Sequence, residues 1–347
     1  MERTLMATEV TAVVGACGPE RQRYAQNLAR RHGAQLVLAQ RVAASDSAVE
    51  DALDQVSQDP EARHLVVEFP LQSPVLHIIG ELADATASAE LTDVVCLVDA
   101  AHLLSDLSST EHLRLASHDN HGPAAVYASR AELVVTQIEY ASMVVLVNTE
   151  ALRARELNLL LTLISYLAPK AHIDMVDASG HQAPHRSMGS FTMEQTHAGW
   201  VSLLNGDFAP RFQDSAVTGL HYEQMRPFHP GRLSELMNRW MDPLDGGTLL
   251  RSAGFCHLAT RSHITGHWNQ VGTHLAMFPA AFDHQLGEED EPLAFGQDLA
   301  LIGLDLKADQ LIDELDDAAL TDSELVGGPA LWATFPDPFP EWSTADH

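Results

Sequence analysis

The sequence predicts an α/β protein in which a doubly wound parallel sheet is followed by a smaller α+β domain. Two observations predict it: short β-branched runs alternate with amphipathic stretches in the first half, and the order of elements changes after residue 217. A length of 347 residues, 46% of them hydrophobic, is enough for two cores. We expect one domain over 1–177, a connecting segment over 178–217 and a second domain with an acidic tail over 218–347.

Buried strands alternate with helices in the expected first domain. Pro19 suits the first turn of a helix. In such a sheet ligands bind at the carboxyl ends of the strands, here near Gly15. The expected strands cover 10–15, 35–39, 64–69, 94–98 and 143–147, and the expected helices cover 19–32, 47–57, 75–83, 128–139 and 154–167.

A β-α-β-β-β-α order is expected in the second domain, which indicates an α+β sandwich with helices on one sheet face. The segment before it is rich in Gly, Pro, Ser and His and shows no sustained period, so we expect little regular structure there. The expected strands cover 220–226, 253–259, 266–272, 273–278 and 299–306, and the expected helices cover 230–240 and 308–319.

The charge of the chain bears on its partners. The formal net charge is -28, from 48 acidic against 20 basic residues. Such a surface repels phosphate backbones and anionic lipids, which argues against direct nucleic-acid or membrane binding and favours a basic protein partner. An odd set of distant cysteines (Cys17, Cys96 and Cys256), no leader pattern and no long apolar run lead us to expect a cytoplasmic protein.

The segment from Gly15 to Gly18 lies where a phosphate-binding loop would lie, between the first strand and the first helix. A working loop reads G-x-x-x-x-G-K-[ST]; here the glycines are three apart and no Lys or Ser/Thr follows. Pro19 removes an amide donor and Glu20 adds negative charge. An ordinary turn is the favoured interpretation, with nucleotide binding as the alternative. Cys96, in an apolar strand, is expected to be a buried core thiol, and Cys17 is the more reactive candidate because a helix N-terminus lowers a thiol pKa.

Several segments strongly resemble one known family. Those of the second half are similar to the C-terminal domain of CobW-type proteins, which are P-loop GTPases linked to metal delivery. In the first half, Val94–Ala100 resembles the central strand of that family, ending in V-D-A, and Val144–Glu150 resembles the strand before its guanine motif. The resemblance implies a P-loop-GTPase-like first domain. The C-terminal segments are Arg226–Leu233, Gly254–Arg261, Leu320–Glu324 and Pro336–Trp342.

The family's active motifs are altered in this chain. Its E-x-x-G becomes Glu68-Phe69-Pro70-Leu71, and its N-K-x-D becomes Asn148-Thr149-Glu150-Ala151. Its C-x-C-C has no counterpart, because residues 40–63 contain no cysteine. The resemblance therefore implies a pseudo-GTPase with a degenerate phosphate loop (Gly15, Cys17, Gly18) and a degenerate base site (Asn148). If the chain were a GTPase, the resemblance implies that Glu68 would bind magnesium and position the attacking water. No cofactor is favoured; GTP with magnesium, or zinc, stays open.

One branch of the family shows similar erosion, and its members recruit a ribosome hibernation factor under zinc limitation. The resemblance to that branch implies a non-catalytic adaptor whose partners are ribosomal proteins or a hibernation factor. The alternative is a zinc metallochaperone GTPase with divergent ligands. A scaffold unrelated to ribosomes is a third possibility.

Histidine is the remaining candidate metal ligand, with 19 in the chain. Some of those in the second domain could converge across a sheet to form a nitrogen-ligand site. The favoured interpretation is that these histidines lie on the surface or form ordinary hydrogen bonds. The aromatic side chains near the end are expected to pack back on the fold. The candidate ligands are His257, His263, His267 and His274, and the aromatic residues are Trp332, Phe335, Phe339 and Trp342.

Overall fold

The computed structural model describes residues 7–45, 47–59, 63–82, 89–115, 126–176, 191, 198–240, 247–282 and 296–342. Within it the chain forms two compact units. Unit 1 comprises residues 1–199 and 210–212, and unit 2 comprises residues 200–209 and 213–347. Much of the expected connecting segment lies outside the described residues; α8 (Gly199–Leu204) is a helix within it.

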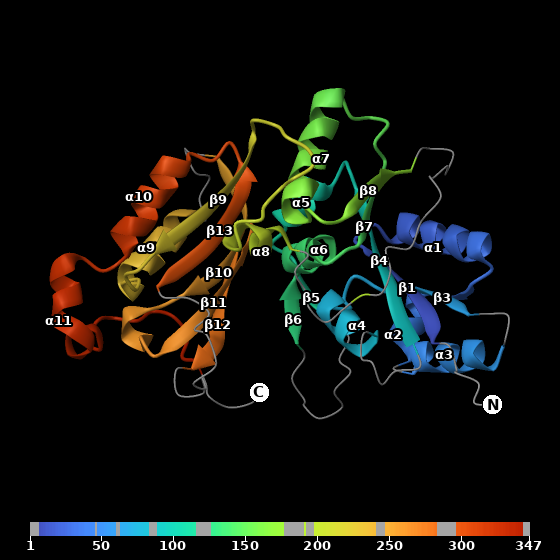
Figure 1. Cartoon of the computed structure of the whole chain (residues 1–347), viewed down its shortest axis with the longest axis horizontal. Helices are drawn as coiled ribbons and strands as arrows, with labels where there is room; N and C mark the ends of the chain where they lie inside the picture. Colours follow the sequence, from blue (N-terminus) through green and yellow to red (C-terminus); the bar gives the residue numbers. More distant parts are fainter. Residues whose placement is uncertain are drawn as a thin grey trace. The chain divides into compact units, whose positions relative to one another are not determined.

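Unit 1 is built on a six-stranded parallel sheet with the order β2-β3-β1-β4-β7-β8 (Figure 1). Its central strands are buried along nearly their whole length, as their runs of Val and Leu predict. The doubly wound parallel sheet is therefore confirmed. The strands are β1 (Thr8–Gly15), β2 (Gln35–Val37), β3 (His64–Glu68), β4 (Ala89–Asp99), β7 (Met143–Val147) and β8 (His172–Met175).

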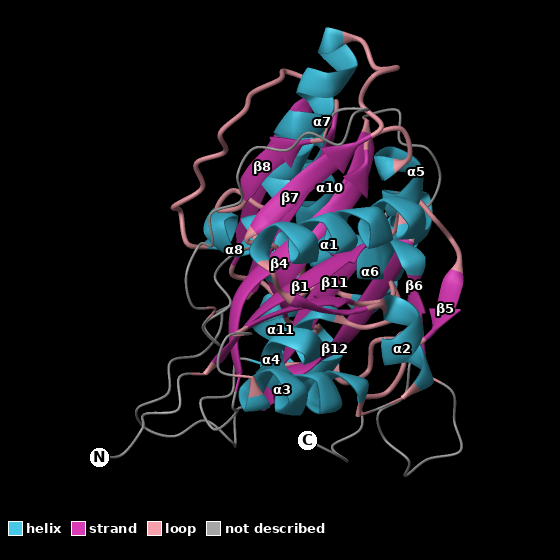
Figure 2. Cartoon of the chain, turned by 90° about the vertical axis from the view of Figure 1, so that its right-hand side faces the viewer, coloured by secondary structure: helices cyan, strands magenta, loops and turns pink. Residues whose placement is uncertain are grey.

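The helices of unit 1 follow these strands as βαβ units require. In Figure 2, α1 (Gly18–His32) lies in front of the strands, and its Tyr24 and Leu28 join a core with Val13 and Val95. Gly33 ends this helix in the left-handed conformation at φ 61°. The other helices are α2 (Ala39–Ala44), α3 (Ala48–Gln58), α4 (Val75–Leu82), α5 (Leu103–Leu107), α6 (Arg130–Glu139) and α7 (Ala154–Leu167).

Several features of unit 1 differ from the expectation. The helices α2 and α5 are not among the expected helices, and α2 takes the last residue of the strand expected over 35–39. A small hairpin of β5 (His112–Arg114) and β6 (Tyr127–Ser129) takes the first two residues of the helix expected over 128–139. That helix begins at Arg130 because the Ser129 side chain accepts a hydrogen bond from the backbone N–H of Glu132 and caps it. The edge strand β8 was not predicted, because its sequence HIDM lacks a continuous apolar run.

Unit 2 holds a five-stranded antiparallel sheet with the order β12-β11-β10-β13-β9. Helices α9 (Pro230–Trp240) and α10 (Ala308–Ala318) share one core with it, as the predicted α+β layer requires. Trp268 and Phe228 are fully buried in that core, with ring centroids 6.4 Å apart. The strands are β9 (Val217–Gln224), β10 (Thr248–Cys256), β11 (Ile264–Val271), β12 (His274–Phe282) and β13 (Gln297–Leu304).

A further helix, α11 (Asp322–Trp332), follows α10 and was not predicted, because it contains the helix-breaking run Gly327-Gly328-Pro329. Thr321 and Glu324 form a capping box at its start. Glu324 also accepts two hydrogen bonds from Arg232, which lower the pKa of its carboxyl to about 2.

The last described residues pack on unit 2, which confirms the expectation for the aromatic side chains. The Arg261 guanidinium donates to the Asp337 carboxylate at 3.0 Å and lies 4.6 Å from the centre of the Trp342 ring. The ring of Phe335 lies 4.5 Å from that of His229. Among the described residues, no helix is both long and apolar enough to cross a bilayer.

Candidate functional site

The loop between β1 and α1 is shaped by two close backbone contacts. Gly15 has a φ of 132°, and a side chain there would collide with the carbonyl oxygen of Leu97 on β4. The N–H of Gly18 donates to the carbonyl of Ala16 at 3.1 Å, and Pro19 has no N–H. Two of the amides that would cradle a phosphate are thus already used or missing.

Arg21 and Glu68 form a buried ion pair next to this loop. Arg21 lies on the first turns of α1 and Glu68 ends β3; their side chains are 9% and 4% exposed. The Nε of Arg21 donates to Glu68 Oε1 at 3.0 Å, and its Nη1 donates to the carbonyl of Gly15. The second carboxylate oxygen, Oε2, accepts the N–H of Ala39 at 3.2 Å. The cation is therefore committed to protein acceptors, and both oxygens of Glu68 are occupied by protein donors.

Sequence reasoning did not identify Arg21 as part of this site. A phosphate loop carries its Lys directly after the second glycine, whereas here the first cation comes three residues after Gly18. The presence of a cation this close to the loop was the signal in the sequence that could have identified Arg21. Its partner is 47 residues away, and only the parallel pairing of β1 with β3 brings the two together.

The space at the carboxyl ends of β1 and β4 is small. A hollow of about 10 Å³ lies there, bordered by Gly15 and Ala16 on one side and by Asp99 and Asp106 on the other. Such a hollow has room for about one water molecule. The carboxylate of Asp99 at its border also opposes a phosphate group electrostatically, whereas that of Asp106 is paired with Arg130 at 3.0 Å.

The expected base-site residue, Asn148, is turned toward a carboxylate. Asn148 follows β7 in the left-handed conformation at φ 58°, and its Nδ2 donates to Asp99 Oδ2 at 3.0 Å. Asp99 also accepts from the His102 ring at 2.9 Å and from the N–H of Ala101. Burial raises the pKa of Asp99, but these hydrogen bonds outweigh it and hold the pKa below its usual value. The same pairing raises the pKa of His102.

The expected lowering of the Cys17 pKa by the helix N-terminus does not occur. Cys17 occupies the N-cap position of α1, but its thiol is partly buried and points at the Leu97 carbonyl at 3.5 Å. Burial raises its pKa to about 12, and the charges of Glu20 and Asp99 raise it further. Desolvation thus outweighs the helix N-terminus. Burial also raises the pKa of Cys256 to about 12 and that of Cys96.

Cys17 is expected to react at least about tenfold more slowly than a free thiol with Ellman's reagent at neutral pH. Burial raises its pKa to about 12, so little thiolate is present, and the greater nucleophilicity of that thiolate offsets only part of the loss. The measurement is release of thionitrobenzoate from native protein, with urea-unfolded protein as the control. A rapid native reaction that disappears in Cys17→Ser would contradict this expectation.

The four candidate histidines lie in different surroundings. Both ring nitrogens of His257 are used, since Nδ1 donates to the Gly296 carbonyl at 2.8 Å and Nε2 accepts from Thr265 at 3.1 Å. His263 is exposed before β11, and His274 begins β12. His267 stacks on Phe278 with ring centroids 4.7 Å apart. Among the described residues, no three His, Cys, Asp or Glu side chains are gathered closely enough to hold a metal ion.

Unit 2 is expected to lose stability as the pH falls from about 6.5 to about 4. Burial, with the charge of Arg251, lowers the pKa of His267 to about 4. Between those values the unfolded chain binds the proton that the folded chain refuses, so acid favours unfolding by up to about 3 kcal/mol. Urea unfolding at several pH values measures this, and His267→Phe should flatten the dependence. An unchanged slope in His267→Phe, or a flattening in the exposed control His263→Gln, would contradict it.

One family model matches part of unit 2. Residues 217–319 match the cobalamin synthesis protein cobW C-terminal domain. The matched residues include all five strands of the unit 2 sheet and the helices α9 and α10. The chain is also 24% identical over 286 residues to zinc-regulated GTPase metalloprotein activator 1 of Dictyostelium discoideum, an alignment that covers 75% of this chain. It spans 58% of the length of that relative.

Among solved structures, the Zn(II)-bound YjiA GTPase from E. coli resembles this chain at 14% identity and a TM-score of 0.36. The superposition covers 90% of this chain and 99% of that one. A Zn(II)-bound triple mutant of YjiA gives the same values. A likeness at this level does not extend to activity or ligands.

Proposed function

We propose that this CobW-like chain is a pseudo-GTPase that works as a non-catalytic adaptor, by binding a basic protein partner. The single observation that carries the proposal is the commitment of Arg21 to Glu68 and Gly15. GTPases of the P-loop class need a free cation on the phosphates and a carboxylate available to magnesium or water. In this chain the cation nearest the loop, Arg21, and the carboxylate of Glu68 are paired with each other. Neither is therefore free for a nucleotide or its magnesium ion.

Electrostatics supports the partner's chemistry. At a net charge of -28 the chain attracts basic proteins and repels bare nucleic acid. The resemblance to the ribosome-associated branch adds a biological setting: the adaptor acts in the cytoplasm during zinc limitation, on basic ribosomal proteins or a hibernation factor.

The adaptor role is tested by sedimentation. Ribosomes from zinc-limited and zinc-replete cells are pelleted through sucrose at near-physiological salt, and the chain is detected in the pellet. The proposal expects it with ribosomes only in zinc limitation, and at a level that falls as salt rises. Its absence from ribosomes in both conditions would remove the ribosomal setting and leave a scaffold role elsewhere.

The non-catalytic part is tested by phosphate release from GTP with magnesium, in the presence and absence of zinc. A CobW-type GTPase with an intact G-x-x-x-x-G-K-[ST] loop serves as the positive control. No release above the enzyme-free background is expected. Release that depends on added chain and is lost in Glu68→Gln would overturn the proposal.

A zinc metallochaperone GTPase is the second candidate, favoured by the similarity to the zinc-regulated GTPase metalloprotein activator 1 of Dictyostelium. In this chain it would require Glu68 to leave Arg21 and histidines to replace the missing cysteines. Its signature would be GTP turnover that responds to zinc. The phosphate-release assay therefore separates the two candidates directly.

A further inference from the structure

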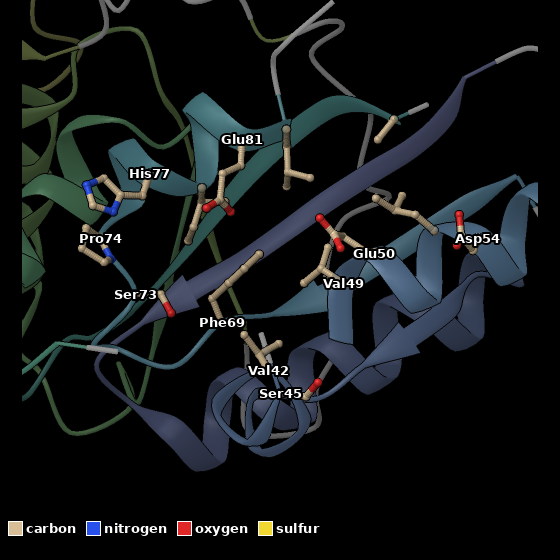
Figure 3. Close-up of a pocket in the computed structure, with 14 residues that line it drawn as sticks. Val42, Ser45, Val49, Glu50, Asp54, Phe69, Ser73, Pro74, His77 and Glu81 are labelled. Atoms are coloured by element: carbon tan, nitrogen blue, oxygen red, sulfur yellow. The ribbon is translucent and has the colours of Figure 1, made fainter. Parts of the chain in front are cut away.

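A groove of about 580 Å³ opens in unit 1 between α3 and α4, above the sheet (Figure 3). Its floor is apolar and includes the buried side chains of Leu53, Phe69, Ile78 and Leu82. This volume lies within the range of pockets that hold ligands in proteins. The residues that line this groove do not include Arg21, Glu68 or the phosphate loop.

Three carboxylates border the apolar floor. Glu50 and Asp54 come from α3, and Glu81 comes from α4. In Figure 3, Glu50 and Glu81 extend from their two helices into the space between them. All three are exposed, and within the described part of the chain none of them pairs with a basic side chain. Of the described residues that line the groove, none is a Lys or Arg.

This arrangement has a cost in the unoccupied chain. Glu50 and Asp54 are four residues apart on one helix, where like charges destabilise by a few tenths of a kcal/mol. Glu81 adds a third negative charge from the facing helix. A cation between the helices would convert this repulsion into attraction.

The carboxylates are too dispersed for a single metal ion. Among the described residues, no set of three acidic, His or Cys side chains is close enough to hold one. Dispersed charges around an apolar floor instead match several cationic groups carried on an apolar body. An amphipathic peptide segment has that composition, with apolar anchors on one face and Lys or Arg beside them.

We propose that the groove between α3 and α4 is the docking site for a basic amphipathic segment of the protein partner. Apolar side chains of the segment enter the floor at Phe69 and Ile78, and its Lys or Arg side chains pair with Glu50, Asp54 and Glu81. The inference rests on the proposed adaptor function and gives it a site and a chemistry of recognition.

The test uses the full chain with labelled isoleucine methyl groups and a synthetic helical peptide that has leucines on one face and lysines on the other. Ile78 reports on the groove, and Ile312 on α10 reports on the acidic face of unit 2. Titration in the NMR spectrometer should shift the Ile78 methyl at near-physiological salt and leave Ile312 nearly unchanged. Peptides with Glu for Lys, or Ser for Leu, should not shift it.

Two charge variants make the test specific. The groove variant combines Glu50→Gln, Asp54→Asn and Glu81→Gln. It should weaken peptide binding about tenfold, because three exposed ion pairs are lost and each contributes a fraction of a kcal/mol to binding. The matched control, Asp309→Asn with Asp313→Asn and Asp317→Asn on α10, changes net charge equally and should weaken it less than about twofold. Thermal unfolding checks that the groove variant is folded, and removal of the repulsion should leave it at least as stable.

Several results would overturn the inference. These are an unmoved Ile78 methyl at millimolar peptide, equal shifts of Ile78 and Ile312, or equal loss of affinity in the two charge variants. Each shows that the groove does not select the peptide. None of them bears on nucleotide binding, so failure of the groove and failure of the non-catalytic proposal are read from different experiments.

Discussion

Replacing Arg21 with alanine is expected to lower the free energy of unfolding of unit 1 by about 3–5 kcal/mol. The change leaves the carboxylate of Glu68, 4% exposed, without its cation in a buried site. It also removes the donor to the Gly15 carbonyl. Urea unfolding followed by circular dichroism measures the loss.

A control variant and a double variant separate the effect of the ion pair from the general effect of shortening an arginine side chain on α1. Arg23→Ala, two residues further along α1 and exposed, should cost less than about 0.5 kcal/mol. Arg21→Met combined with Glu68→Leu removes both charges and should recover most of the loss, because no buried charge is left unpaired. A cost for Arg21→Ala no larger than that of Arg23→Ala would show that the pair does not form.

Trp268→Ala is expected to cost unit 2 about 3–5 kcal/mol. The side chain of Trp268 is fully buried, with 0% exposure, and packs against Phe228 in the core that β11 shares with α9 and α10. Its Nε1 also donates to the Ser252 hydroxyl at 2.7 Å. The loss is read from the unfolding transition of unit 2 in urea.

Smaller changes at the same site should be graded. Trp268→Phe keeps an aromatic ring but loses volume and the N–H donor, so it should cost less than the alanine variant. Met225→Ala, at a side chain 74% exposed, should cost under about 0.5 kcal/mol. Equal stability of Trp268→Ala and Met225→Ala would contradict the described core.

The parallel sheet was predictable because its strands are short apolar runs, such as 143–147, that recur between amphipathic helices. Elements without such a signal were missed: β8 carries His and Asp, and α11 contains Gly327-Gly328-Pro329. β8 forms because it pairs with β7, whereas α11 is kinked at Gly328, whose backbone is not helical. The capping box of Thr321 and Glu324, fixed by Arg232, helps α11 to form despite its composition.

The candidate site was predictable only in part. The missing Lys and Ser/Thr of the phosphate loop are visible in the sequence, but the pairing of Arg21 with Glu68 depends on β1 lying beside β3. The pKa of Cys17 depends in the same way on burial, which the helix N-terminus alone does not reveal. The like charges of Glu50 and Asp54 are visible, whereas the position of Glu81 across the groove is a product of folding.

The central claim is that the ion pair of Arg21 and Glu68 has replaced nucleotide binding. Calorimetric titration of the full chain with GTP and GDP, with magnesium present and zinc both present and absent, tests it most directly. The account predicts no heat of binding up to millimolar nucleotide. Micromolar binding of either nucleotide would contradict it and would favour the metallochaperone GTPase.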